Sequence, residues 1–184
     1  MKVHKKWIIL MAGMTVIAFA GLFATEPSFV CDFNKINGAD VAWLITATIF
    51  VLMMTPGLSF FYGGMVGAKN VISTMLQSFI AMGLVSVLWV VFGFSLAFGD
   101  NIGGVLGDFL MFQHVGADTY ITPTGRLLGG ATIPLALYAL FQMKFAIITP
   151  SLITGSFAER VRFSAYLFFM MWFMVFIYCP LAHM

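Results

Sequence analysis

Four long apolar stretches occupy most of this chain, and each is long enough to cross a lipid bilayer. They cover approximately residues 41–66, 71–98, 128–157 and 163–184. A transmembrane helix needs about 20 apolar residues. Because lipid offers no hydrogen-bond partners to an exposed backbone, we expect these stretches to be helices rather than strands. The Thr55-Pro56-Gly57 sequence is expected to interrupt the first of them.

The composition excludes the common soluble classes of protein. Hydrophobic residues make up 61 % of the 184 residues and charged residues only 9 %, whereas soluble domains carry about 25 % charged residues. The net charge is +2 and no basic stretch alternates with aromatic residues, so nucleic acid is not an expected partner. The motifs of phosphate-binding loops, zinc proteases and serine hydrolases are absent from the sequence, so we expect neither an enzyme nor a bound cofactor or metal. The predicted fold class is an all-α polytopic membrane protein.

Residues 1–24 have the pattern of a signal peptide. Lys2, Lys5 and Lys6 precede an apolar run at 7–23, and Ala18-Phe19-Ala20 has the form of a cleavage site. The alternative is an uncleaved membrane anchor, for which this run is short. We therefore divide the chain into a signal peptide at 1–24 and a membrane domain at 25–184.

Charges in the connecting segments predict the orientation of the helices. Lys69 lies between the first two apolar stretches, and Arg160 and Arg162 lie between the last two. Acidic residues dominate the opposite connections, 25–40 and 99–127. Lysine and arginine in short loops mark the cytoplasmic side. The first helix is therefore predicted to begin outside the cytoplasm, as it would after removal of a signal peptide.

Lys144 and a pair of phenylalanines stand out within the third stretch. Lys144 is the one charge deep in an apolar stretch, and it either snorkels to the membrane surface or faces a polar cavity. Phe141 and Phe145 share one helix face, and on spacing alone such a pair contacts lipid or belongs to the core. Glu159, next to Arg160, is interpreted as part of a charged anchor at the cytoplasmic membrane surface.

Glycines and cysteines add weaker signals. Gly63 and Gly67 have the spacing that lets two helix backbones approach closely, and we interpret them as packing residues. Cys31 and Cys179 both fall on the outer side in the predicted topology. A disulfide between them stays open, because sequence does not give the distance between the two cysteines. His183 is a lone histidine and is interpreted as structural.

Several sequence blocks together resemble the ammonium transporter family, the Amt branch of the Amt/Rh superfamily. They occur in the order in which that family has them and cover most of residues 40–184. Any one block is weak evidence, and the set is specific. The blocks are TPGLSFFYGGM at 55–65 with KNV at 69–71, LWVVFGFSLAFG at 88–99, FQMKFAIITP at 141–150 with GSFAER at 155–160, and PLAHM at 180–184.

The resemblance implies an ammonium-transporter-like helical bundle, a multi-pass protein of the inner or plasma membrane. In this family a complete chain has about eleven helices in two inverted halves and forms a homotrimer with one narrow apolar pore per subunit. Phe145 matches the phenylalanine of the outer gate, and Phe141 matches the aromatic residue one turn before it. Lys144 lies about 100° away from Phe145 around the helix and is expected at a helix or subunit interface. The implied partners are ammonium or ammonia, the lipid bilayer and, as a candidate, a PII-type regulatory protein.

The matched region corresponds to about the first four transmembrane helices of the family, which leaves three functions open. The family's outer-site tryptophan, its second gate phenylalanine, its outer serine and both pore histidines would follow residue 184, and His183 matches the histidine before that tryptophan. The first hypothesis is the N-terminal part of a channel-like ammonium transporter. The second is an ammonium sensor or regulatory subunit without its own conduit. The third is a structural partner that inserts into transporter trimers and silences them, or a non-conducting truncated product. By themselves, residues 1–184 are predicted not to conduct ammonium.

Overall fold

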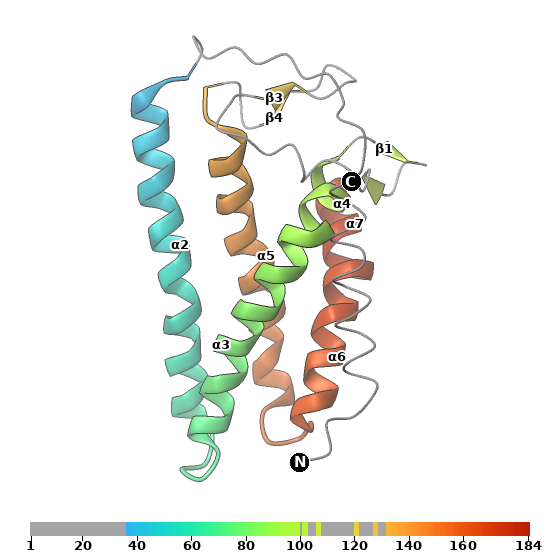
Figure 1. Ribbon diagram of the computed structural model, residues 1–184. Helices are drawn as coiled ribbons and strands as arrows, with labels where there is room; N and C mark the ends of the chain where they lie inside the picture. The colour runs from blue at the N-terminus through green and yellow to red at the C-terminus, as the bar shows by residue number, and fades with distance from the viewer. Residues whose placement is uncertain (1–35, 100, 103–105, 108–119, 122–126, 129–131) are drawn as a thin grey trace.

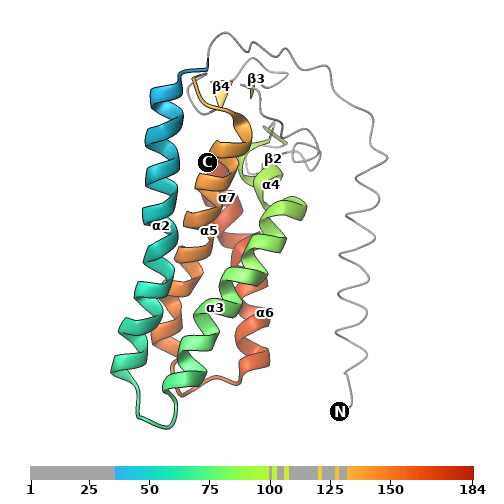
Figure 2. The ribbon, with the colours of Figure 1, turned by 60° about the vertical axis from the view of Figure 1, so that its left-hand side comes forward.

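The described membrane part of the chain is a bundle of four long helical segments, whose arrangement Figures 1 and 2 show. The computed structural model describes residues 36–99, 101–102, 106–107, 120–121, 127–128 and 132–184. Within these residues, four helical segments are long and apolar enough to cross a membrane. The predicted signal peptide at 1–24 and Cys31 lie outside the described residues.

The described elements follow one another from the first membrane segment to the last. α2 packs against both α3 and α5, and α3 also packs against α5 and α6. The bundle therefore has α3 and α5 at its centre and α2 at one edge, as Figure 2 shows. The elements are α2 (Gly38–Met65), α3 (Val71–Leu88), the π-helical turn η2 (Trp89–Gly93), α4 (Phe94–Phe98), β1 (Asn101–Ile102), β2 (Leu106–Gly107), β3 (Tyr120–Ile121), β4 (Leu127–Leu128), α5 (Leu135–Phe157), α6 (Phe163–Phe173), the π-helical turn η5 (Met174–Tyr178) and α7 (Cys179–His183).

Most helix ends in the structure lie within a few residues of the ends predicted from the sequence. The second span, 71–98, is continuous through α3, η2 and α4, as predicted. The third begins later than expected. Pro134 caps α5 with extended backbone angles, φ −60° and ψ 140°, and β4 pairs antiparallel with β3 before it. The prediction of helix from residue 128 was therefore wrong by about two turns, because apolar character does not separate a short strand from a helix start.

The expected interruption at Pro56 is also absent from the fold. α2 runs without a break from Gly38 to Met65 and contains Pro56. Proline is tolerated inside membrane helices when neighbouring groups satisfy the freed backbone. Gly63 lies where α2 meets α3, and a Cβ there would stand 2.9 Å from Cγ of Met75. Gly67 lies outside the helix, so only the first glycine of the pair serves helix packing.

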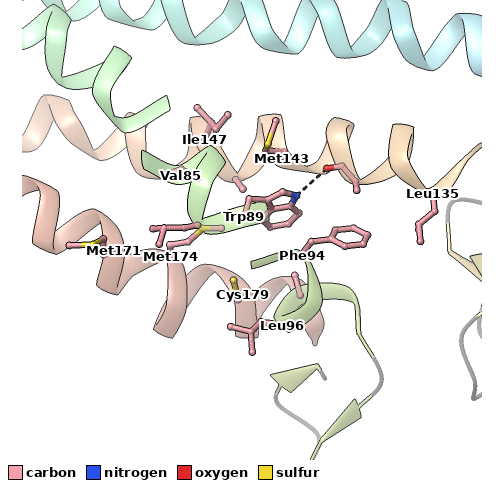
Figure 3. Close-up of a cluster of buried hydrophobic side chains, with 14 residues drawn as sticks. Val85, Trp89, Phe94, Leu96, Leu135, Met143, Ile147, Met171, Met174 and Cys179 are labelled. Carbon is pink, nitrogen blue, oxygen red and sulfur yellow. Dashed lines mark hydrogen bonds between the residues drawn. The ribbon is translucent and has the colours of Figure 1, made fainter. Parts of the chain in front are cut away.

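Trp89 is the centre of the hydrophobic core between α3, α5 and the last span (Figure 3). It is 1 % exposed, and its indole Nε1 donates a 3.1 Å hydrogen bond to the carbonyl of Ala139 on α5. The rings of Phe94, Phe98 and Tyr178 pack around it with centroid distances of 5.8, 6.2 and 6.1 Å. A buried tryptophan whose N–H has found a partner fixes the separation of the two helices.

The two π-helical turns face each other across this core. A Cβ on Gly93 in η2 would stand 2.9 Å from Cε of Met174 in η5. A π-helical turn displaces backbone hydrogen bonds, and the carbonyl of Gly93 accepts a bond from Sγ of Cys179 at 3.6 Å. Cys179 is a free, fully buried thiol in the structure. The other cysteine of the pair that the sequence left open, Cys31, lies outside the described residues.

Candidate functional site

α5 presents three faces with different surroundings. One face belongs to the core, and Ala139, Met143, Ala146 and Ile147 on it are at least nine-tenths buried. Met143 and Ile147 belong to the same buried cluster as Trp89, and Figure 3 draws all three. The remaining two faces carry the residues that the sequence singled out. The packing of this one face against Trp89 therefore sets where the other two point.

Lys144 lies on the second face, toward α2. It lines a groove of about 200 Å³ together with apolar side chains of α2 and α5. No hydrogen bond or ion pair joins its ammonium group to any residue that the structure describes. The prediction of a helix interface for Lys144, away from the phenylalanine pair, is confirmed by this position. The other residues of the groove are Ile45, Thr48, Ile49, Leu52, Leu137 and Leu140.

Phe141 and Phe145 lie on the third, open face of α5. Their ring centroids are 5.0 Å apart and their planes meet at 79°, an edge-to-face pair. Such pairs are favoured by about 0.5–1.5 kcal/mol beyond their area burial. Phe145 is 38 % exposed, and Thr149 one turn later donates a 2.8 Å hydrogen bond to its carbonyl. The pair is thus pre-formed and open on one side.

Ring contacts from Trp89 through Phe98 to Tyr138, here called the aromatic ladder, hold the turn of α5 before Phe141 in place. The ring of Tyr138, one turn before Phe141, meets Phe98 of α4 edge-on at 5.4 Å. Phe98 in turn contacts Trp89, whose indole is bonded to Ala139. Contacts from α4 and η2 therefore fix the turn of α5 that carries the phenylalanine pair. At the end of the last span, Nδ1 of His183 lies 3.2 Å from the carbonyl of Ala97, which agrees with a structural role for this histidine.

Glu159 connects two loops, a role that the sequence did not reveal. Its Oε1 accepts hydrogen bonds from the backbone N–H of Gly67 and from Nδ2 of Asn70, both at 3.0 Å. Its own backbone is left-handed, with φ 63°, a conformation that costs energy in a residue other than glycine. The loop after α2 and the loop after α5 are therefore tied together at one end of the bundle. This contact places Lys69, Arg160 and Arg162 at the same end, as the charge pattern predicted.

The two hydrogen bonds lower the pKa of the Glu159 carboxyl, with that from Asn70 contributing most and that from Gly67 next. We call these two hydrogen bonds the Glu159 clamp. Because the pKa of Glu159 is lowered in the folded state, the clamp contributes stability above the unfolded pKa and loses it as the pH falls through the folded pKa.

The clamp ties residues 66–70 to Glu159, so we expect Glu159→Ala to speed hydrogen exchange in residues 66–70 at neutral pH. Arg160→Ala is the matched control and should leave that exchange unchanged. Equal exchange in wild type and Glu159→Ala would contradict the clamp.

The described residues contain no group of histidine, cysteine, aspartate or glutamate that could hold a metal ion. The candidate site on the described residues is the aromatic pair of Phe141 and Phe145. Spacing and resemblance had identified both of its phenylalanines. The structure adds the aromatic ladder behind them and the position of Lys144 on a different face.

Comparisons with known proteins agree on one family. The model of the Ammonium Transporter Family matches residues 42–184. An ammonium transporter of Mycobacterium bovis is 41 % identical over 158 residues, which are 80 % of this chain and 33 % of that protein. An ammonium transporter of Bacillus subtilis is 42 % identical over 146 residues, covering 78 % of this chain and 34 % of that protein.

Solved structures give the same result for the fold. A crystal structure of Saccharomyces cerevisiae Mep2 superimposes with a TM-score of 0.69 at 27 % identity, over 82 % of this chain and 33 % of that one. The G343C mutant of Candida albicans Mep2 gives 0.69 at 29 % identity, over 82 % and 32 %. The chain spans about one third of the length of the relatives it matches. It is a multi-pass membrane protein, and it belongs to the ammonium transporter family.

Proposed function

We propose that the membrane domain at 25–184 forms one wall of an ammonium-conducting pore, with Phe145 and Phe141 lining its outer gate. The observation that carries the proposal is the edge-to-face pair on the open side of α5, with Phe145 38 % exposed. The ladder from Trp89 to Tyr138 holds this pair in position. The remaining walls of the pore belong to the complete transporter, since the relatives are about three times as long.

The chemistry of the pair suits a small cation that is able to lose a proton. A cation over an aromatic face gains about 0.5–1 kcal/mol when exposed and about 2 kcal/mol or more when desolvated. An apolar passage beyond the rings disfavours the charged form. Ammonium gives its proton to water at the outer mouth and enters such a passage as ammonia, whereas potassium has no proton to lose. The gate therefore selects by acidity as well as by fit.

The proposed orientation places residue 38 outside the cytoplasm and the Glu159 clamp inside, in the plasma membrane or the bacterial inner membrane. It follows from the basic residues at the clamped end, Lys69, Arg160 and Arg162. Reporter fusions after residue 69 and after residue 112 are expected to report opposite sides of the membrane. The same side for both fusions would contradict the orientation.

Mass spectrometry of the mature N-terminus tests removal of the proposed signal peptide at 1–24.

α2 is the helix most available to a neighbouring subunit, and we propose that the complete protein is a homotrimer. Only 11 % of its most apolar window is buried within the chain, and Trp43 and Phe50 are 77 % and 66 % exposed. Mass measurement of the full-length protein in detergent tests the trimer.

A PII-type regulatory protein is the proposed partner at the end of the bundle where Glu159 ties the two loops together. A pull-down with a PII-type protein tests this partner.

Transport itself is tested in cells that lack their own ammonium transporters. The full-length protein containing residues 1–184 is expected to give saturable methylammonium uptake that ammonium inhibits. Binding of ammonium by the purified protein without any uptake would instead favour the sensor hypothesis.

A further inference from the structure

Gln142 lies on the same open face of α5 as the phenylalanine pair. With about 100° of rotation per residue, Phe141, Phe145 and Gln142 fall within about 100° of arc, and Gln142 lies at a height between the two rings. By the same rotation, the buried core residues Met143 and Ile147 lie on the opposite side of the helix, and Lys144 lies in the groove toward α2. Among the described residues of α5, Gln142 is therefore the amide beside the proposed gate, and it lies on a different face from Lys144.

The amide of Gln142 has no partner within the described protein. Its side chain is partly exposed, and no hydrogen bond joins it to a residue that the structure describes. An unpaired polar group at membrane depth is energetically costly. In contrast, the Thr149 hydroxyl on the same face is already bonded to the carbonyl of Phe145. Gln142 thus offers the free hydrogen-bonding group that the rings lack.

We propose that Oε1 of Gln142 accepts a hydrogen bond from an ammonium ion held against the rings of Phe141 and Phe145. The proposal rests on the proposed function and assigns a further binding residue to the same site. Phenyl rings attract the positive charge but provide no lone pair to an N–H group. Ammonium carries four N–H donors, so one amide oxygen beside the rings complements the cation–π contact. Gln142 therefore raises the affinity for the ion.

Gln142→Leu in the full-length protein tests the proposal because it removes the acceptor and keeps a similar volume. A hydrogen bond to a charged group is worth roughly a tenfold to hundredfold change in affinity. We expect the KM for methylammonium uptake to rise about tenfold or more, with an unchanged maximal rate per amount of protein in the membrane. Gln142→Glu retains an acceptor and is expected to keep the KM at or below the wild-type value.

Gln77→Leu is the matched control, since it removes the same amide from a buried position on α3 and should leave the KM unchanged. An unchanged KM in Gln142→Leu, with active wild type, would overturn the proposal. If Gln142→Leu does not accumulate, Gln142→Asn decides: its shorter side chain withdraws the acceptor, so a raised KM supports the proposal and an unchanged KM overturns it. Absence of uptake by the wild type would instead refute the proposed function itself.

Discussion

Phe145→Ala in the full-length protein is expected to weaken ammonium binding at the proposed outer gate and to admit potassium. Loss of the ring removes a cation–π contact worth about 0.5–2 kcal/mol, which corresponds to a KM for methylammonium uptake that is about 2- to 30-fold higher. It also removes one ring of the edge-to-face pair on the open face of α5, and this pair is proposed to narrow the pore. Methylammonium uptake and potassium uptake, measured in the same cells, report both effects.

Phe79→Ala is the control for this substitution. Phe79 on α3 is 39 % exposed, against 38 % for Phe145, so the two variants lose a ring of equal exposure. Phe79 does not belong to the proposed gate, and its loss should leave the KM and potassium exclusion unchanged. If Phe145→Ala also left both unchanged, the gate role of Phe145 would be wrong.

Residues 1–184 expressed alone are expected to give no methylammonium uptake above background. The open face of α5 carries Gln142 without a protein partner, and its phenylalanine pair has no opposing wall among the described residues. Polar groups that faced lipid in place of a pore would each cost several kcal/mol. Uptake by this fragment, compared with the full-length protein at equal expression, tests the prediction. Saturable uptake by the fragment would show that four helices suffice for conduction.

The helices of this bundle could be predicted from sequence because membrane insertion depends on local composition. Long apolar stretches specify helices wherever the backbone has to satisfy its own hydrogen bonds. The errors lay where the outcome depends on neighbours. Pro56 lies inside a continuous α2, and the helix expected from residue 128 begins only after Pro134. The π-helical turns at Trp89–Gly93 and Met174–Tyr178 have no local sequence signal, since they arise where two packed helices adjust to each other.

The candidate site likewise combines features that the local sequence predicts with features that depend on distant neighbours. The spacing of Phe141 and Phe145 places both rings on one helix face, and the resemblance gave them a role that spacing alone did not. Glu159 was interpreted as a surface anchor because its partners, Gly67 and Asn70, lie about ninety residues away. Such long-range contacts become visible only when the fold brings the two loops together. The partnerless amide of Gln142 likewise emerges only once the surroundings of α5 are known.

Purified full-length protein in liposomes provides the most direct measurement of the central claim. An inward ammonium gradient is expected to give protein-dependent ammonium uptake that saturates, and an equal potassium gradient is expected to give none. This difference is expected because ammonium is able to lose a proton before it enters the proposed apolar pore beyond Phe145, and potassium is not. Equal uptake of both ions, or no protein-dependent uptake of ammonium, would contradict it.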